Sequence, residues 1–502
     1  MGLLAAALPA QNLELGVVGG SMPGPFELGI AGGLPFEIVL IVPSSTSGPT
    51  PLSLVDPADP RSLSIGVDLV GNAIAAITDF NGEVSLPGQL SLVPSLVDVP
   101  LYWQAVTFAF QPTLVDRISN PDVFRFGIAG EFRDRGLTTF DLRAFATALE
   151  RADRKTLIVG GARGALLAQV AVDTTEIYDP ITDTFVNGPT MTTPRSLHTQ
   201  TKLDDGRYLI CGGVDDANNP QASCEIYDPV ADTFTAVASM NSPRMGATAT
   251  LLADGRVFVS GGLEAISVTP TQLQAIRDAV DSTEIYDPVT DTWTVGPPMS
   301  DPRAGHVALQ RTDGVIVLAG GISWDPNILF GWLPTVRTSS DLYDPATNTM
   351  SAGPSMNDAR ALTDPVAIGA DRWLIAGGMN GLSIIPFNAG NPTASAEIYD
   401  GASNTFTSVG SMATARANQK AWALGNGQYL LAGGGDGSIL SPVPLSSTEV
   451  FDTATNTFSP GPAMNAPRAA AGIYFTTQGQ VFLFGGADSG ATITNTTEWY
   501  FF

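Results

Sequence analysis

The stretch TEIYDPVTDTWTVGPPMSDPR, Thr283 to Arg303, is too regular to be a loop between unrelated elements. Its EIYDP core also begins at Glu176 and Glu225, and a near copy ending in glycine begins at Glu397. The β-branched and aromatic residues favour strands. Asp-Pro-x-Thr-Asp is turn chemistry, because proline presets φ and the Asp and Thr side chains satisfy backbone groups. The stretch is therefore interpreted as a repeated strand-turn-strand unit.

Seven units follow one another, and in each an apolar run ends in a glycine pair. The first glycines are Gly160, Gly212, Gly261, Gly320, Gly377, Gly433 and Gly485. Seventeen residues before each stands an arginine: Arg143, Arg195, Arg244, Arg303, Arg360, Arg416 and Arg468. After each pair an acid opens a further strand: Glu176, Glu225, Glu284, Asp341, Glu397, Glu449 and Glu498. Nine residues beyond six of these acids come Phe185, Phe234, Trp293, Met350, Phe406 and Phe458.

Only one interval in the unit varies, and it separates the glycine pair from the acid. It runs from 12 residues after Gly213 to 22 residues after Gly262. Each unit is interpreted as four short antiparallel strands, a to d, with the glycine pair in positive φ at the end of strand b. Such a unit cannot bury both faces alone, so the units pack radially and the ring closes. The spacing predicts an all-β fold, a seven-bladed β-propeller.

The order Gly-Gly, Glu-x-Tyr-Asp-Pro, aromatic, Met-x-x-Pro-Arg resembles the kelch repeat. The form PRAGHVALQRTDGVIVLAGG, Pro302 to Gly321, is most similar to kelch units of the galactose oxidase-like superfamily. The resemblance covers about three-quarters of the chain. It implies the propeller fold but leaves function open, because one fold hosts many activities.

The last blade lacks a strand d, because the chain stops at TEWYFF, where a seventh strand c ends. GEFRDRG, Gly130 to Gly136, lies at the right distance before Arg143 to supply it. We therefore expect the propeller to span residues 121–502, closed by a strand near 130–136. Closure in trans, which would make a strand-exchanged polymer and self-assembling structural subunit, is the alternative.

Composition limits the possible partners. The 502 residues carry a formal charge of −25 and only three lysines, which disfavours nucleic acid. No apolar stretch reaches the ~20 residues that span a bilayer. Residues 1–11, MGLLAAALPAQ, are similar to the end of a signal segment, so we expect export to the cell surface, the periplasm or the medium.

Residues 12–120 differ from the repeats. Alternating runs such as PFEIVLIV and PLYWQAVTF, separated by Gly, Pro and Ser, predict a small antiparallel β-sandwich. Asp79 to Phe108 resembles a β-rich module of secreted proteins from some environmental bacteria, which implies no particular activity. Asp79, Asn81 and Gly82 hint at calcium, but two oxygen ligands are too few, so a hairpin turn is predicted.

The chemistry-bearing residues are sparse. Galactose oxidase-like enzymes, by the resemblance, hold copper with histidines and tyrosines, one of them cross-linked to cysteine. This chain has only His198 and His306, each three residues after a repeat arginine, which favours packing or hydrogen bonding over metal ligation. Cys211 and Cys224 face each other across a short b–c segment and form either a disulfide or two small buried apolar groups. No metal, cofactor or catalytic residue is predicted.

The seven arginines and seven acids also suggest a charged ring. Strands a and c run in the same direction, so both groups begin at the same end of each blade. One ion pair per blade is the simpler interpretation, and we predict a structural role for them, not a ligand site.

The variable b–c segments are where binding function is expected, since a rigid scaffold with variable loops on one face is how binding proteins are built. Leu263 to Asp281 predicts a short amphipathic helix with Leu273, Ile276 and Val280 on one side. The segments 322–339 and 379–395 supply aromatic and aliphatic side chains: Trp324, Phe330 and Trp332, then Ile384, Ile385 and Phe387. A fourth segment, 435–446, is smaller. Trp324, Phe330, Trp332 and Phe387 are the candidate binding residues; packing of these segments on one another or on the sandwich is the alternative.

The sequence thus predicts a non-catalytic, exported protein that binds a protein or glycan partner, or assembles, through the b–c face of a kelch-like propeller. A carbohydrate-active or oxidase-like enzyme with a degenerate site is the second interpretation, and a homo-oligomer formed by strand exchange is the third. The scarcity of histidine weighs against the enzyme.

Overall fold

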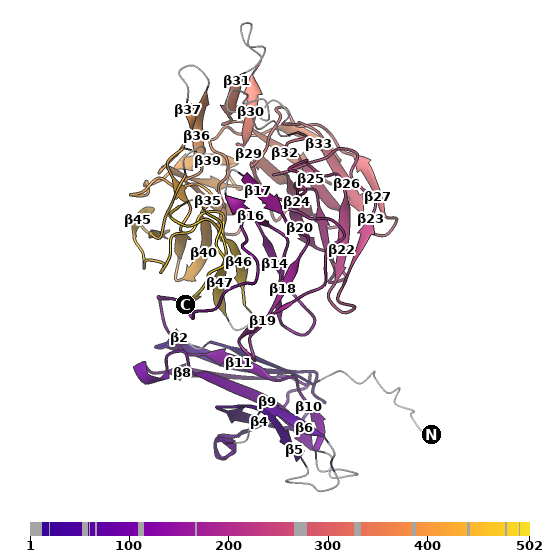
Figure 1. The fold of residues 1–502 in the computed structure, drawn as a ribbon, viewed down its shortest axis with the longest axis vertical. Helices are drawn as coiled ribbons and strands as arrows, with labels where there is room; N and C mark the ends of the chain where they lie inside the picture. Colours follow the sequence, from indigo (N-terminus) through magenta and orange to yellow (C-terminus); the bar gives the residue numbers. More distant parts are fainter. Residues whose placement is uncertain are drawn as a thin grey trace.

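The computed structural model describes residues 13–19, 21–52, 59, 61–65, 68–108, 115–165, 168–265, 279–325, 333–383, 388–438, 442–476, 479–490 and 492–502. Nearly all regular structure in this part of the chain is β-strand. Figure 1 shows two bodies, a ring of blades and a smaller layered module next to it. The expected signal-like residues 1–11 lie outside the described residues.

The ring consists of seven four-stranded antiparallel sheets, here called blades 1 to 7 in the order of their arginines. The first three blades are β14 (Thr147–Glu150), β15 (Thr156–Val159), β18 (Thr175–Asp179), β19 (Thr184–Asn187); β20 (Thr199–Lys202), β21 (Tyr208–Cys211), β22 (Cys224–Asp228), β23 (Thr233–Val237); β24 (Thr248–Leu251), β25 (Val257–Ser260), β26 (Thr283–Asp287), β27 (Thr292–Val295). Blades 4 and 5 are β28 (Val307–Gln310), β29 (Ile316–Ala319), β32 (Ser340–Asp344), β33 (Thr349–Ala352); β34 (Val366–Gly369), β35 (Arg372–Ala376), β38 (Ala396–Asp400), β39 (Thr405–Ser408). Blades 6 and 7 are β40 (Lys420–Gly425), β41 (Gln428–Ala432), β44 (Thr448–Asp452), β45 (Thr457–Pro460); β46 (Gly472–Phe475), β47 (Gln480–Phe484), β48 (Thr497–Phe501), β13 (Phe132–Arg133). The chain is an all-β propeller.

The repeated residues make the repeated geometry. Both glycines of each pair adopt positive φ, as at Gly160 (57°) and Gly161 (93°), where a side chain is strained. The turn between strands c and d places an Asp or Asn in left-handed backbone. In blades 1 to 5 the tyrosine five residues earlier donates its hydroxyl to that side chain, as Tyr286 does to Asp291 at 2.9 Å. The strand-d aromatic then packs on the same ring, with 5.0 Å between the centroids of Tyr286 and Trp293.

The last blade is closed by the chain's own N-terminal side. β13 pairs with β48 in antiparallel register, Phe132 opposite Tyr500 and Arg133 opposite Trp499. Phe132 is buried against Trp422 and Tyr500, so the closing strand also joins blade 7 to blade 6. The edge that strand exchange requires is therefore occupied within the same chain.

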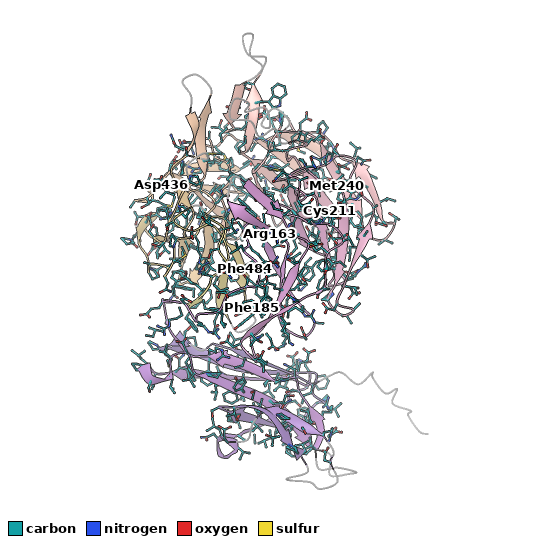
Figure 2. All side chains as sticks on the ribbon, viewed as in Figure 1. Arg163, Phe185, Cys211, Met240, Asp436 and Phe484 are labelled. Carbon is teal, nitrogen blue, oxygen red and sulfur yellow. A yellow bond between two sulfur atoms is a disulfide. The ribbon has the colours of Figure 1, made fainter. Side chains whose placement is uncertain are left out.

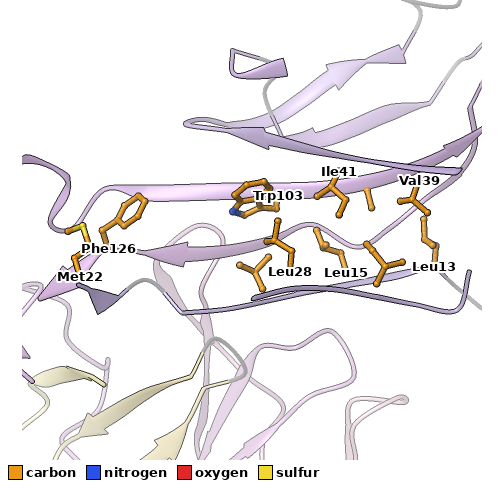
Figure 3. Close-up of a cluster of buried hydrophobic side chains, with 11 residues drawn as sticks. Leu13, Leu15, Met22, Leu28, Val39, Ile41, Trp103 and Phe126 are labelled. Atoms are coloured by element: carbon orange, nitrogen blue, oxygen red, sulfur yellow. The ribbon is translucent and has the colours of Figure 1, made fainter. Parts of the chain in front are cut away.

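The smaller module is a layered β-structure. One sheet has the order β1 (Glu14–Val18), β3 (Gly24–Ala31), β8 (Val84–Leu90). The other has the order β10 (Val115–Ile118), β9 (Pro100–Phe108), β4 (Ile38–Ser44), β7 (Ile74–Ile77), with β11 (Asp122–Arg125) also paired to β9. Figure 3 shows Leu15 and Leu28 from the first sheet meeting Val39, Ile41 and Trp103 from the second. We call this module the sandwich.

Shorter elements complete the sandwich. A hairpin of β5 (Ser47–Pro51) and β6 (Ser62–Ile65) covers the outer face of the second sheet, and two single-turn 3₁₀ helices span Val70–Asn72 and Pro94–Leu96. β2 (Ser21–Met22) pairs in parallel with β12 (Gly127–Ile128). Since β11 and β12 both pair with sandwich strands, the module runs past the expected boundary at residue 120.

The turn at Asp79 differs from the expected hairpin. Asp79 Oδ1 accepts hydrogen bonds from the backbone N–H groups of Asn81 and Glu83, which is ordinary turn chemistry. The strands that it connects, β7 and β8, belong to different sheets, so the turn crosses from one layer to the other. The local sequence correctly predicted a turn. It could not show that the two strands on either side of the turn belong to different sheets.

The sandwich contacts the propeller at the turns of blades 1 and 7. Arg154, between strands a and b of blade 1, donates to the Leu15 carbonyl at 2.6 Å and pairs with Asp122 at 3.2 Å. Arg125 pairs with Asp183 in the c–d turn of blade 1 at 3.5 Å. Gln480 of blade 7 donates to the Arg125 carbonyl at 3.4 Å. The sandwich therefore lies on the face opposite to the b–c segments, and those segments do not pack on it through any described contact.

Candidate functional site

Within the part of the chain that the structure describes, four b–c segments extend into β-hairpins on the propeller face away from the sandwich, which we call the hairpin face (Figure 1). They are β16–β17 (Ala162–Ala165, Ala168–Ala171), β30–β31 (Ile322–Asp325, Leu333–Val336), β36–β37 (Met379–Ser383, Asn388–Pro392) and β42–β43 (Gly435–Asp436, Val443–Pro444). Three of the four belong to the neighbouring blades 4, 5 and 6. Sequence reasoning selected these three segments but passed over β16–β17, although the blade 1 interval, Gly161 to Glu176, equals the blade 6 interval, Gly434 to Glu449.

The hairpins of blades 4 to 6 form a continuous wall. β31 lies against β36, and β37 lies against β42. Their bases share a buried apolar cluster of Ile322, Val336, Ala361, Met379 and Ala417. Neighbouring segments therefore pack on one another at the base, as one of the two expectations had it, while the hairpins rise above the rim of the ring (Figure 1).

Trp324 is the one candidate binding residue whose surroundings are described. It lies on β30, half-buried, and packs against the small cluster of Leu263, Ala279 and Ala304. Its indole Nε1 has no hydrogen-bond partner among the described residues, although a buried indole N–H normally finds one. Phe330, Trp332, Phe387, Ile384 and Ile385 lie outside the described residues, as do Leu273 and Ile276 of the expected helix.

Arg337 fixes the base of the blade 4 hairpin. Its guanidinium pairs with Asp325 at 2.8 Å and with Asp301 at 3.3 Å, and it donates to the Trp324 carbonyl at 3.1 Å. Arg337 thus connects the hairpin strand that carries Trp324 with Asp301, in the segment that precedes strand a of the same blade. Pre-ordering of this kind lowers the entropy lost when a surface binds a partner.

A polar hollow of about 220 Å³ opens on the same face between blades 1 and 2. It is lined by Asp141, Arg163, Asp173, Thr174 and Asp216, with Val170 and Ala171 at its apolar side. Asp141 accepts a hydrogen bond from the Thr174 hydroxyl at 2.5 Å and lies 3.4 Å from Arg143. Arg163, on β16 (Figure 2), is exposed to solvent. Neither Arg163 nor the hollow had been singled out from the sequence.

The seven repeat arginines and acids lie beneath this face as buried pairs. Side-chain N···O distances fall between 2.7 and 3.2 Å, and every one of these arginines is at most 1–2% exposed. Each guanidinium also donates to the carbonyl of the first glycine of its blade, as Arg303 does to Gly320 at 2.8 Å. Each acid accepts a backbone N–H from the preceding segment, as Asp341 does from Ser300. Each arginine and each acid is buried and paired within its own blade, so these side chains are not accessible to a ligand.

The two histidines join neighbouring blades. His198 Nε2 lies 2.9 Å from the Thr147 hydroxyl of blade 1, and His306 Nε2 lies 2.9 Å from Ser260 and 3.1 Å from Thr248 of blade 3. In blade 6 the same repeat position holds Gln419, whose amide donates to Thr363 at 3.1 Å. Burial, with a smaller contribution from the neighbouring arginine, lowers the pKa of both histidines to about 3, so both are uncharged at neutral pH.

Cys211 and Cys224 are joined by a disulfide across β21 and β22. Both are buried, in a cluster that includes Met240, which Figure 2 labels beside Cys211. In blades 1 and 3 the equivalent register positions hold Val159 opposite Thr175 and Ser260 opposite Thr283. The bridge is thus an addition to a pairing that the other blades make without it.

A ring of backbone hydrogen bonds surrounds the centre of the hairpin face, and the sequence did not predict it. The residue two after each repeat arginine adopts left-handed φ, a set of seven comprising Phe145, Leu197, Gly246, Gly305, Leu362, Asn418 and Ala470. Six of them donate their N–H to the carbonyl of the equivalent residue one blade back, with N···O distances of 2.8–3.3 Å. Five of the seven are not glycine, so nothing in residue type gave a signal.

These residues do not fit a copper centre built from histidine and tyrosine. Each imidazole Nε2 is committed to a hydroxyl of the neighbouring blade, both cysteines are in the disulfide, and the strand-c tyrosines of blades 1 to 5 donate to their own turns. Across the described ranges, no group of three or more His, Cys, Asp or Glu is placed to hold a metal ion. Among the same residues, no helix is long and apolar enough to cross a membrane.

Comparison with known proteins agrees with the fold. The Kelch motif family model matches residues 205–241 and 246–300, in blades 2 and 3. The F-box/kelch-repeat protein SKIP4 of Arabidopsis thaliana is 31% identical over 115 residues, which are 23% of this chain and 29% of that protein. The chain therefore spans less than a third of that relative's length. Together with the repeated sheets, these matches show a β-propeller with kelch motifs in blades 2 and 3.

The propeller architecture is also found in a solved structure. A fungal alcohol oxidase of the AA5 family, solved in complex with copper, has a TM-score of 0.55 at 17% identity and covers 74% of this chain and 76% of its own. The structure of YjhT has a TM-score of 0.45 at 15% identity, over 61% of this chain and 95% of its own. At 17% identity the likeness to the oxidase concerns the fold alone.

Proposed function

We propose that this chain is a non-catalytic binding protein, exported from the cell, that recognises a protein or glycan partner with the hairpin face of its kelch propeller. The observation that carries the proposal is the placement of the length variation. All of it falls on one face, where three neighbouring hairpins form a wall, while the sandwich is docked on the other face. Variable loops on one rim of a constant scaffold are the usual design of a binding surface.

The chemistry of the face supports a partner with both apolar and polar groups. The half-buried Trp324 offers an amphipathic ring of the kind enriched in interface hot spots. The hollow beside Arg163 offers three carboxylates and a guanidinium, groups that bind hydroxyls and amides. The Cys211–Cys224 bridge and the signal-like start support export, since disulfides persist in oxidising compartments.

Shortening one hairpin tests the proposal. In blade 2 the segment VDDANNPQA, Val214 to Ala222, makes the short b–c connection. Exchange of residues 322–338 for this segment gives blade 4 the blade 2 length without altering strands b and c. The probes are a glycan array and cross-linking to extracellular proteins of the native source.

We expect the shortened chain to fold with a lower melting temperature, because Ile322 and Val336 leave the buried cluster at the hairpin base, and to lose at least tenfold in affinity for the partner that the unaltered chain binds. Val289→Lys, in an exposed c–d turn on the sandwich side of the ring, is the matched control and should bind as before. Undiminished binding by the shortened chain, with loss in the control, would place recognition on the other face.

A further inference from the structure

A second exposed surface lies on the sandwich. Five large apolar side chains are exposed to solvent there: Leu34 (60%), Phe36 (67%), Ile38 (57%), Ile77 (64%) and Phe80 (78%). We call this set the apolar edge patch. Single exposed apolar residues are ordinary on a surface, but a contiguous group of large ones marks an interaction site.

Backbone pairing makes the patch contiguous. Ile38 on β4 lies directly opposite Ile77 on β7. Beyond that pair, Thr78 donates to the Glu37 carbonyl at 3.0 Å and Phe36 donates to the Asp79 carbonyl at 3.4 Å. The two segments that carry the five side chains are thus joined along their length, and the patch is held in a fixed shape before any partner arrives.

The patch borders an open sheet edge. β7 ends the order β10-β9-β4-β7, and no described strand pairs with its outer side. Because Thr78 donates to Glu37, the antiparallel alternation directs the backbone groups of Ala75 and Ile77 outward. The strand reads IAAI, with no charged residue, proline or bulge of the kind that protects edge strands from added chains.

The charge around the patch selects its occupant. The sandwich, residues 13–128, carries eleven carboxylates and three arginines, Arg61, Arg117 and Arg125, and Arg117 is already paired with Glu37 beside the patch. Asp79 and Glu83 stand exposed beside Phe80. A second copy of the chain would bring the same acidic rim against this one, and an anionic membrane would be repelled equally. A segment with Lys or Arg next to its apolar residues complements both features.

We propose that the apolar edge patch and β7 bind an extended segment of a partner protein in which apolar residues alternate with Lys or Arg. The segment adds as a strand to β7 through the outward groups of Ala75 and Ile77. Its apolar side chains cover Ile38, Ile77 and the two phenylalanines, and its basic side chains face Asp79 and Glu83. Figure 1 draws β4 below β2 and β8, on the side farther from the propeller. The chain could then bind two partners, one at each end. The proposal for the sandwich does not depend on binding at the hairpin face.

The test uses the full chain and three labelled peptides in fluorescence anisotropy. The probe is the capped peptide KIKVKIK, the first control replaces its lysines with glutamates, and the second replaces its central valine with proline. Ile77→Lys places a like charge beside the probe, and Val289→Lys adds the same charge on an exposed propeller turn. Sedimentation equilibrium of the unaltered chain measures self-association.

We expect KIKVKIK to bind the unaltered chain and Val289→Lys equally, at least tenfold more weakly to Ile77→Lys, and more weakly as salt rises. Both control peptides should bind at least tenfold more weakly than the probe. Equal binding to the two variants, equal binding of the glutamate or proline peptide, or no binding of the probe would overturn the proposal. So would a dimer of the unaltered chain that Ile77→Lys dissociates, since the occupant would then be a second copy.

Discussion

The outer strands of the propeller and the edge strand of the sandwich meet solvent in opposite ways. Three propeller outer strands have the sequences TWTV, TMSA and TFSP, with Thr or Ser at the alternating outward positions and a Gly-Pro pair directly after each. β7 reads IAAI and leaves Ile77 exposed. Proline and polar residues discourage the addition of a further strand. One chain therefore protects its repeated edges and leaves the edge of its unique module open.

The two regions also differ in how charge is used. Each blade buries one arginine with one acid, whereas an ion pair on the sandwich leaves one partner partly exposed, as Arg61 is beside Asp59. In the repeats, a charged residue at a fixed position is structural. In the sandwich, exposed carboxylates remain available to a partner. A charged residue that recurs at the same position in every blade is therefore expected to be structural and not functional. Four experiments test this difference between the two regions, in order of decreasing expected effect.

Breaking one buried pair should give the largest loss of stability. Arg303→Ala leaves Asp341 charged and buried, which costs about 3–5 kcal/mol of unfolding free energy. Arg256, which pairs with Asp254 at the surface, is the matched control, and Arg256→Ala should cost less than about 1 kcal/mol. Urea unfolding measures both. Similar small losses in the two variants would mean that the buried ring does not hold the blades.

The constant spacing of arginine, glycine pair and acid was sufficient to predict the propeller, because each residue type answers a local demand. The glycines occupy positive φ, and the arginine and acid satisfy each other and the strand ends. The ring of left-handed residues from Phe145 to Ala470 escaped prediction, because its hydrogen bonds depend on the relative placement of neighbouring blades. The apolar edge patch escaped for the same reason: IAAI reads as a buried strand until the sheet order places it at an edge.

Removing the disulfide should give the next largest effect and tests whether blade 2 needs more than its neighbours. Cys211→Val with Cys224→Thr copies the pair that blade 1 carries in the same register. For a sequence separation of 13 we expect a loss of about 3 kcal/mol, because the bridge restricts the unfolded chain.

A reductant should destabilise the unaltered chain by a similar amount and leave the double variant unchanged. If the variant matches the oxidised chain in urea, blade 2 gains no stability from its bridge, and the pairing shared with blade 1 is sufficient.

Each histidine should give a smaller effect than the disulfide, and this effect depends on pH. Their pKa in the folded chain, about 3, lies below the usual value of 6.5, so the unfolded chain binds more protons as the pH falls through 6.5. Stability from this source is complete above pH 6.5 and declines progressively towards pH 3. At pH 5 each histidine should cost about 2 kcal/mol relative to pH 7.

Glutamine is the natural control, because Gln419 already occupies the equivalent position. The double variant His198→Gln, His306→Gln should lose less stability than the unaltered chain between pH 7 and pH 5, by about 4 kcal/mol, as measured in urea. Parallel pH profiles for the two proteins would show that the imidazoles are protonated in the folded state or are not buried.

The smallest change in unfolding free energy is expected at the open edge of β7. A small change there, beside a large change in the blades, would distinguish this edge from the blades. Ile77→Lys should change the unfolding free energy by no more than about 0.5 kcal/mol, because the side chain is already 64% exposed. Ile41→Ala, in the same sheet but fully buried, should cost about 2–5 kcal/mol and supplies the reference. A large loss for Ile77→Lys would mean that another part of the chain covers Ile77 in solution, and a covered residue is not available to a partner. If the unfolding free energy does not change, stability does not explain the large apolar side chain at position 77. Solubility would favour a charged residue there, so binding is the explanation that we propose.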